Sequence, residues 1–262
     1  MKTIKTVLIT GACINTGVSI VEKFASEGYN VIFTGRIMER VHAAEKEYKA
    51  KFPDVQIIGY HIDSLLDERT VDEASVEKMF ADIDRRGLFV ETLVLNAADQ
   101  GLGQKIFENP LIDFMKVINT NVVWNYCLCE HAARRMKENG GGNIVFVNSN
   151  TAYRAIPDRI AYEASKCGQL GMMRGLALDL GKYNIRVNAV LPGMIKTDRW
   201  VNNVNNTKYC LPNYTPIRDI AEFEDIANAV YYLGSDESRI TTGAELVVDG
   251  GMLAQLVPSV ER

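Results

Sequence analysis

The balance of charge along this chain argues against two classes of binding partner. Of its 262 residues, 33 are acidic and 29 are Lys or Arg, which gives a formal net charge of −4. Nucleic acids and anionic membrane surfaces both select strongly basic proteins, so we expect neither as a partner. Hydrophobic residues make up 47% of the chain, enough for one large core, yet no segment approaches the ~20 apolar residues of a membrane span.

The N-terminus and the cysteines predict the cellular compartment. "MKTIKTVLIT" places lysines before a short apolar run that ends in a glycine-rich turn, which predicts a strand rather than a signal peptide. The number of cysteines is odd, and no pair has the spacing of a zinc site. We therefore expect reduced thiols, no metal and a cytoplasmic protein. The cysteines are Cys13, Cys127, Cys129, Cys167 and Cys210.

Short apolar runs alternate with helical patterns along the whole chain. The runs are apolar on both faces, which is typical of buried parallel strands. The expected strands are 7–10, 31–34, 56–62, 92–95, 143–148, 186–191 and 245–248. The expected helices include 17–26, 40–51, 75–85, 112–137 and 162–182. This alternation predicts a single α/β domain over residues 1–262, a Rossmann-type doubly wound parallel sheet of about seven strands with helices on both faces.

Two stretches fit the alternation poorly. Residues 64–72 form a polar insert after the third expected strand. Residues 199–222 are rich in asparagine, tyrosine and proline, and a loop of this length is usually functional or disordered. We expect a substrate loop there, and a substrate wall from residues 99–103, 151–158 and 199–213. These segments offer Tyr153, Arg154, Trp200 and Tyr209.

The first expected strand leads into the turn "VLITGACINTG", residues 7–17. Gly11 would permit the tight turn, and Gly17 would let the helix start close to the sheet, where its N–H groups can hold a pyrophosphate. Asn15 stands where a nucleotide-binding loop ordinarily has a further glycine. Alone, the pattern also fits a plain turn between strand and helix. The candidate cofactor contacts are Gly11, Cys13, Ile14, Asn15, Thr16 and Gly17.

The end of the second expected strand favours one of the two nicotinamide cofactors. Dinucleotide folds place an acid here to bind the ribose 2′-hydroxyl of NAD, whereas an arginine suits the 2′-phosphate of NADP. "VIFTGR" supplies Arg36, and no acid lies between Asn30 and Met38. A guanidinium can grip a phosphate with two parallel hydrogen bonds. We therefore expect NADP(H) rather than NAD(H), the alternative being that Arg36 is an ordinary surface residue.

A third pattern combines three residues that can move a proton. In "SNTAYRAIPDRIAYEASKCG", Ser149, Tyr162 and Lys166 stand thirteen and then four residues apart. Tyr162 and Lys166 would share one helix face. A phenol with a pKa of ~10 is a poor acid or base at neutral pH. A neighbouring ammonium favours the phenolate, so we expect Lys166 to lower the pKa of Tyr162. Taken singly, such residues are usually helix surface pairs and caps.

Together these patterns resemble the short-chain dehydrogenase/reductase family, in its compact type that includes 3-oxoacyl reductases. The similarity covers essentially the whole chain. "LNAA", "NTNVV", "IRVNAVLPGMIKTD" and "LVVDGG" resemble further family elements in the family's order. The resemblance implies a catalytic role for Asn121, Ser149, Tyr162 and Lys166. It further implies cofactor contacts at Asp63, Asn96, Ala97, Tyr162, Lys166, Pro192, Gly193, Ile195 and Thr197.

The resemblance also assigns roles to the catalytic residues. Tyr162 would give a proton to a carbonyl oxygen that Ser149 binds, while the cofactor reduces the carbon. Lys166 would hold the nicotinamide ribose, and Asn121 would anchor a water that connects Lys166 with solvent. Asp63 would bind adenine, although by itself it fits a turn equally well.

Several residues depart from the family pattern. Asn15 replaces a glycine, but Asn tolerates left-handed backbone better than other residues with a side chain. Ile14 occupies a position that is often basic in members that use NADP, which leaves Arg36 alone in that role. Leu95 and Ala98 differ from the family's Asn-Asn-Ala-Gly element. Trp124 fills a position that is often glycine and could tighten a helix interface.

The sequence thus predicts an NADP(H)-dependent oxidoreductase that interconverts a small-molecule ketone and a secondary alcohol. The alternatives are a catalytically idle cofactor-binding sensor and an NAD-dependent dehydrogenase of a steroid or sugar alcohol. The substrate itself stays open. Residues 112–137 carry more apolar surface than one sheet face should need, including Phe114, Val117, Trp124 and Leu128. Such surface and the family resemblance predict a homotetramer.

Overall fold

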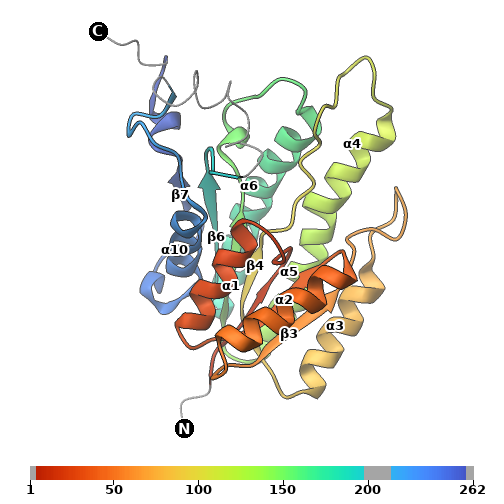
Figure 1. The fold of residues 1–262 in the computed structure, drawn as a ribbon, viewed down its shortest axis with the longest axis vertical. Helices are drawn as coiled ribbons and strands as arrows, with labels where there is room; N and C mark the ends of the chain where they lie inside the picture. Colours follow the sequence, from red (N-terminus) through yellow and green to blue (C-terminus); the bar gives the residue numbers. More distant parts are fainter. Residues whose placement is uncertain (1–3, 198–213, 258–262) are drawn as a thin grey trace.

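A seven-stranded parallel sheet forms the centre of the molecule (Figure 1). The computed structural model describes residues 4–197 and 214–257. Along the sheet the strands follow the order β3-β2-β1-β4-β5-β6-β7, so the winding reverses between β1 and β4. Their bounds are β1 Thr6–Ile9, β2 Asn30–Gly35, β3 Ile57–His61, β4 Val90–Leu95, β5 Gly142–Val147, β6 Ile185–Pro192 and β7 Glu245–Val248. The predicted doubly wound α/β fold is confirmed.

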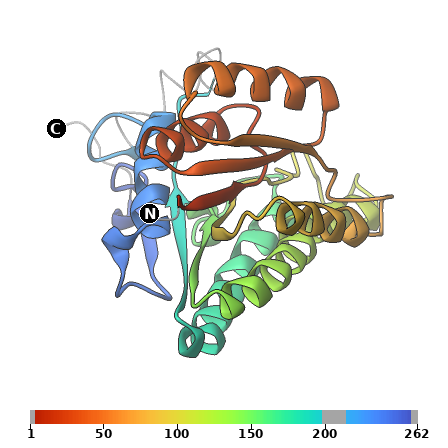
Figure 2. The ribbon, with the colours of Figure 1, turned by 90° about the horizontal axis from the view of Figure 1, so that it is seen from below.

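Helices cover both faces of this sheet, as the view from below shows (Figure 2). One layer contains α1 (Thr16–Ser26), α2 (Met38–Lys51) and α10 (Phe223–Gly234). The other contains α3 (Glu73–Arg85), α5 (Trp124–Glu138) and α6 (Ile160–Leu180). Each layer buries its own apolar cluster against the sheet, and every residue of β1 and β2 is buried. Burial on both faces explains why these strands are apolar without alternation.

The helices of the structure differ from the predicted helices in two places. The expected helix 112–137 consists of α4 (Leu111–Ile118), a π-helical segment over Asn119–Val123, and α5. A π-bulge inserts one residue into a turn and leaves the apolar pattern largely intact, so hydrophobic periodicity does not reveal it. The bulge contains the buried Asn121. Helix α10, which the sequence analysis did not single out, begins at a capping box formed by Glu222 and Asp225.

Much of the apolar surface that we attributed to an interface lies inside the protomer. Trp124 is 2% exposed, and Val117 and Leu128 are fully buried. The side chain of Trp124, which we expected to tighten a helix interface, packs within one protomer, in the core under the sheet. The apolar side chains that do remain exposed on α4, on α5 and on the π-helical segment between them include Leu111, Phe114, Val123 and Tyr126.

The two irregular stretches differ in how much of them the structure describes. In the insert 64–72, Leu65 and Val71 form an antiparallel bridge, and the Ser64 hydroxyl lies 3.0 Å from that of Thr120. Most of the expected substrate loop 199–222, with Trp200 and Tyr209, lies outside the described residues. Within the described ranges, no helix combines the length and the apolar character that crossing a membrane requires.

Candidate active site

The turn between β1 and α1 depends on its two glycines. Gly11 has a φ of +65°, and a Cβ there would lie 2.9 Å from the Cα of Ala97. A Cβ on Gly17 would lie 2.7 Å from the Cα of Ala12. Any larger residue would therefore push the turn away from the sheet. The Asn96 amide nitrogen holds the turn from the other side, with hydrogen bonds of 3.0 Å to the carbonyls of Thr10 and Gly11.

Asn15 holds an unusual backbone conformation at the start of α1. Its φ is +51°, as the sequence led us to expect, but its ψ of −135° lies outside the left-handed helical region. No side chain caps the first turn of α1, which leaves backbone N–H groups available to an anion. The shape of this turn therefore fits the pyrophosphate of a dinucleotide.

Replacement of Asn15 by glycine should stabilise the protein. Non-glycine residues in sparsely populated regions cost about 1–3 kcal/mol, whereas the extra flexibility of glycine in the unfolded chain costs less. We expect Asn15→Gly to raise the free energy of unfolding by about 1 kcal/mol in urea denaturation. Asn15→Ala should lower it, because alanine tolerates positive φ less well than asparagine. Equal destabilisation by both variants would contradict strain at this residue.

The other predicted cofactor contacts lie at the carboxyl ends of the strands, along the edge where open α/β sheets bind ligands. Arg36 follows β2 directly and is exposed, and Asp63 follows β3. Ile14 is exposed, whereas Cys13 is half-buried beneath Gly35. Thr16 starts α1, Asn96 and Ala97 follow β4, Pro192 ends β6, and Gly193, Ile195 and Thr197 come directly after it.

Three of the predicted catalytic side chains meet at the start of α6. The Tyr162 hydroxyl is hydrogen-bonded to that of Ser149, which follows β5. The Lys166 Nζ lies 5.4 Å from the centre of the Tyr162 ring, one helical turn away. A Tyr-x-x-x-Lys spacing on a helix produces this geometry, because residues i and i+4 share a face. The half-buried Tyr162 and the buried Ser149 and Lys166 thus form one cluster.

Burial controls the protonation of this cluster. It lowers the pKa of Lys166 to about 7. It also raises the pKa of Tyr162, and the hydrogen bond from Ser149 and the charge of Arg159 only partly oppose this rise. Our expectation of a lowered pKa for Tyr162 is therefore wrong for the protein without cofactor. Desolvation outweighs the neighbouring charges, and the phenol stays protonated at neutral pH.

The sequence analysis missed a buried network beneath Lys166. Its Nζ donates to the carbonyl of Val147 at 2.9 Å and to the Gln169 side-chain oxygen at 3.2 Å. Gln169 in turn donates to the backbone carbonyl of Asn121 at 2.7 Å. Asn148 donates to the Gln169 oxygen at 3.0 Å. The only signal in the sequence was that Gln169 lies on the same face of the helix as Lys166, three residues later.

Asn121 enters the site through the π-helical segment. Its side-chain amide donates to the carbonyl of Asp99 at 2.8 Å and to the Ser165 hydroxyl at 2.9 Å. The side chain therefore joins the end of β4 to α6, and its backbone carbonyl points toward Gln169. Arg159 was also missed as a neighbour of the site, and its guanidinium carbon lies 5.6 Å from the centre of the Tyr162 ring.

Comparison with known proteins agrees with this geometry. A family model described as enoyl-(acyl carrier protein) reductase matches residues 11–253. The chain is 33% identical to a 3alpha-hydroxysteroid dehydrogenase of Mediterraneibacter gnavus, over 94% of this chain and 96% of that protein. It is also 33% identical to an NADP-dependent (R)-specific alcohol dehydrogenase of Lentilactobacillus kefiri, over 96% and 97%. The structure of ElxO with NADP bound superposes with a TM-score of 0.86 at 27% identity, over 97% and 100%.

The match to the family model covers most of the chain, and both relatives align over nearly their whole length. The names of the two relatives describe dehydrogenases of a hydroxysteroid and of an alcohol, which interconvert CH–OH and C=O groups. The Ser149, Tyr162 and Lys166 cluster at the carboxyl ends of a doubly wound sheet is the arrangement that such a reaction needs. The chain therefore belongs to the short-chain dehydrogenase/reductase family and is an oxidoreductase that acts on CH–OH and C=O groups.

Proposed function

We propose that this protein is an NADP(H)-dependent reductase of a small-molecule ketone. The hydrogen bond between Ser149 and a Tyr162 that is protonated at neutral pH carries this proposal. A protonated phenol beside a second hydroxyl suits proton donation to a carbonyl oxygen better than proton removal from an alcohol. The preference for NADP(H) rests on Arg36 and is supported by the NADP-dependent relative and the NADP-bound structural neighbour.

The chain offers a place for each part of the cofactor. The turn at Gly11 and the first turn of α1 would hold the pyrophosphate, Arg36 the 2′-phosphate and Asp63 the adenine. Lys166 would hold the nicotinamide ribose, and the residues after β6 would cover the nicotinamide. When bound, the cofactor supplies the hydride that reduces the carbonyl carbon.

The chain's own residues handle the oxygen of the substrate. Ser149 would orient the carbonyl oxygen by a hydrogen bond. Tyr162 would then transfer its phenolic proton to that oxygen as negative charge develops there. The positive charge of Lys166 lies close enough to stabilise the phenolate that results. Burial of the cluster excludes water and strengthens each of these interactions.

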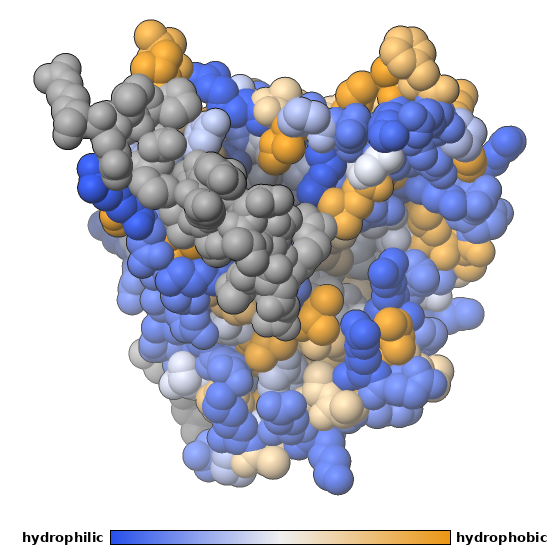
Figure 3. Space-filling model, turned by 45° about the horizontal axis from the view of Figure 1, so that its top comes forward, coloured by the Kyte–Doolittle hydropathy of each residue, from blue (hydrophilic) through white to orange (hydrophobic). Residues whose placement is uncertain are grey.

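The rim of the site favours an apolar substrate. Leu102, Tyr153 and Ile156 lie in the expected substrate wall and are about half exposed. Further along the loop before α4, Ile106 and Phe107 extend this apolar surface, and Phe107 is 97% exposed. Figure 3 shows apolar residues on the upper right of the molecule, over this loop. We infer a bulky apolar ketone such as an oxosteroid, the ketone that corresponds to the hydroxysteroid in the name of one relative.

Turnover of cofactor with a panel of ketones tests the proposed function. We expect NADPH oxidation with steroid ketones to exceed that with 3-oxoacyl thioesters and sugar ketones. NADH in place of NADPH should give a lower rate in each assay. A catalytically idle sensor would bind NADPH but oxidise it with no member of the panel. If a sugar ketone is reduced with NADH as fast as with NADPH, this result would instead support an NAD-dependent dehydrogenase of a sugar alcohol.

We further propose a homotetramer in the cytoplasm. The exposed side chains of Leu111, Phe114, Val123 and Tyr126, on α4, α5 and the π-helical segment between them, would be covered by a second subunit, since exposed apolar patches usually mark interfaces. Light scattering at micromolar concentration should report about four times the 29.2 kDa chain mass. A fully active monomer would contradict the tetramer. The large apolar side chain of Trp124 would then be explained by its place in the core of the protomer alone.

A further inference from the structure

The network beneath Lys166 differs from what the family resemblance led us to expect. The resemblance implied that Asn121 anchors a water molecule that connects Lys166 with solvent. In the structure the side-chain amide of Gln169 connects Lys166 with the backbone carbonyl of Asn121, with its oxygen 3.2 Å from the Lys166 Nζ and its nitrogen 2.7 Å from the Asn121 carbonyl. Gln169 is 1% exposed, so its amide lies in the core rather than at the surface.

We propose that Gln169 is a positioning residue that holds the ammonium of Lys166 in place of a water-mediated link to solvent. This inference rests on the proposed function. An amide oxygen accepts a hydrogen bond from an ammonium and so favours the charged form, which burial disfavours. Unlike water, an amide does not take up and release protons at neutral pH. Gln169 thus helps Lys166 to keep its positive charge beside Tyr162 against the effect of burial.

The orientation of Gln169 is itself fixed by its neighbours. Its oxygen accepts from Asn148, and the same Asn148 amide donates to the backbone carbonyl of Lys166 at 3.0 Å. Its nitrogen is occupied by the carbonyl of Asn121. If the amide were flipped, its NH₂ group would face the donors of Lys166 and Asn148, and its oxygen would face the carbonyl of Asn121. The network therefore keeps the oxygen turned toward Lys166.

Gln169→Met tests this role, because methionine preserves the length of the side chain and removes the three hydrogen bonds of the amide, to Lys166, Asn148 and Asn121. Without the amide oxygen, the pKa of Lys166 should fall further and the Tyr162 phenolate should lose support. We expect the acidic limb of the pH profile of kcat for NADP-dependent alcohol oxidation to move up by about one pH unit. The KM for the alcohol should change little, since Gln169 does not line the substrate wall.

Two further variants keep this test decisive. Gln169→Ala leaves room for a water and should shift the limb by about half as much, which also gives a second measurement if the methionine variant does not fold. Asn143→Leu removes a different buried amide, bonded to Thr92 and Gly234, and should lower stability without moving the limb. A wild-type profile in the folded Gln169 variants, together with an inactive Tyr162→Phe, would reject the positioning role and retain the proposed function.

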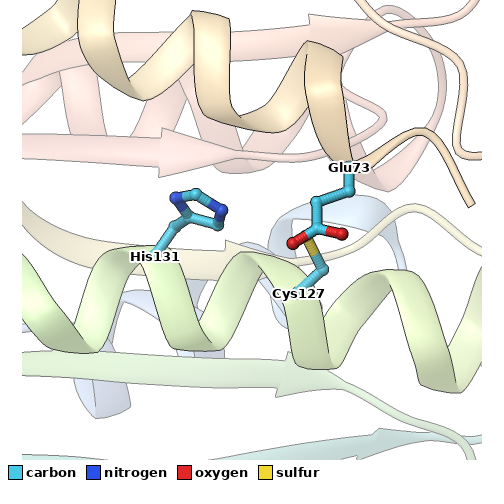
Figure 4. Close-up of side chains that lie close together, drawn as sticks. All are labelled: Glu73, Cys127 and His131. Atoms are coloured by element: carbon cyan, nitrogen blue, oxygen red, sulfur yellow. The ribbon is translucent and has the colours of Figure 1, made fainter.

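A second inference comes from a different part of the molecule. Glu73 at the start of α3 faces Cys127 and His131, which lie one turn apart on α5 (Figure 4). One potential ligand atom from each side chain lies within 4.8 Å of the other two. Within residues 4–197 and 214–257, none of these side-chain donor atoms has a hydrogen bond or ion pair. The His131 ring is oriented by stacking on Phe80 at 5.6 Å.

We infer that Glu73, Cys127 and His131 form a binding site for a divalent transition-metal ion such as Zn²⁺. Sulfur, imidazole nitrogen and carboxylate oxygen are the ligands that zinc takes, and a water would complete a tetrahedral site. The sequence analysis expected no metal, because Glu73 is distant in the chain and the two residues on α5 match no zinc motif. The helix packing between α3 and α5 brings the third ligand to them.

The charges around the three side chains suit a cation. The carboxylate of Glu73 is itself one of the proposed ligands, and Asp72 directly precedes it at the start of α3. The carboxylate of Glu130, on α5, is already paired with Arg134. A metal ion would therefore bind beside the negative charge of Glu73. It would replace the thiol proton by a bond to sulfur and release that proton to solvent, so affinity should increase with pH.

Titration with Co²⁺ under reducing conditions tests the site. We expect one ion per chain and a near-ultraviolet absorption band from the bond between thiolate and cobalt. Cys127→Ser should abolish the band, and Glu73→Gln and His131→Ala should each weaken binding about ten-fold or more. Cys167→Ser and His42→Ala alter exposed residues elsewhere and serve as matched controls. Both should leave the absorption band and the affinity for Co²⁺ unchanged. Zn²⁺ should compete with Co²⁺ and raise the melting temperature. A band that survives in Cys127→Ser, or no binding to the wild-type protein, would overturn the site.

Discussion

Tyr162→Phe should reduce kcat for ketone reduction by about 10²–10⁴-fold while NADPH still binds. The substitution removes one oxygen atom and leaves the ring in its place between α6 and Ser149. Among the described residues, no other side chain is placed to give a proton to an oxygen that Ser149 binds. The ammonium of Lys166 instead donates to the carbonyl of Val147 and to the side-chain oxygen of Gln169.

Steady-state turnover with the best ketone of the panel measures this loss, and fluorescence titration with NADPH shows whether the cofactor site is intact. Tyr183→Phe is the matched control, because Tyr183 lies between α6 and β6, remote from Ser149. It should keep wild-type turnover. Retention of more than a tenth of wild-type kcat in Tyr162→Phe would remove Tyr162 from its role as the acid.

Arg36→Ala should weaken NADPH binding by about 10- to 150-fold and leave NADH binding nearly unchanged. This range follows from the ~1.5–3 kcal/mol of a hydrogen bond to a charged group. The side chain of Arg36 is exposed directly after β2, and it forms no hydrogen bond or ion pair within residues 4–197 and 214–257. Its guanidinium is therefore available to a phosphate without first breaking another contact.

Dissociation constants for NADPH and NADH, measured in parallel at low and physiological salt, test this prediction. The loss should be larger at low salt, where exposed charges are less screened. Arg85→Ala removes the same charge from α3, on the other face of the sheet, and should affect neither cofactor. If the wild-type protein binds the two cofactors equally well, Arg36 does not recognise a 2′-phosphate.

Most of the strands could be predicted from the sequence because burial on both faces forces an apolar run, as in β1 and β2, where every residue is buried. The edge strand β7 is only partly buried, but its short run of apolar residues was still sufficient to predict it. The catalytic cluster could be predicted because Tyr162 and Lys166 lie on one helix and their spacing alone fixes their proximity. The sequence could not predict which way burial would move the pKa of Tyr162, since that depends on the packing around it.

The parts that escaped prediction depend on tertiary contacts. Gln169 gains its role only because the π-helical segment turns the carbonyl of Asn121 toward it. Trp124 looked like interface surface because an apolar residue on a helix does not reveal which neighbour covers it. Glu73 meets Cys127 and His131 only through the packing of α3 against α5. Each of these relations joins residues far apart in the chain, and no local pattern records them.

The order of strands in the sheet also constrains how the chain can fold during synthesis. The central strand β1 is made first, yet one of its two partners is β4, and the hydrogen bond from Thr10 to Val94 spans 84 residues. At a translation rate of about 5–20 residues per second, β1 waits several seconds for that partner. During this time the backbone N–H and C=O groups along one of its edges are unpaired and most of its side chains are apolar, which favours association with other nascent chains. We expect co-expression of chaperones to increase the yield of folded protein, because β1 is then protected until β4 is made.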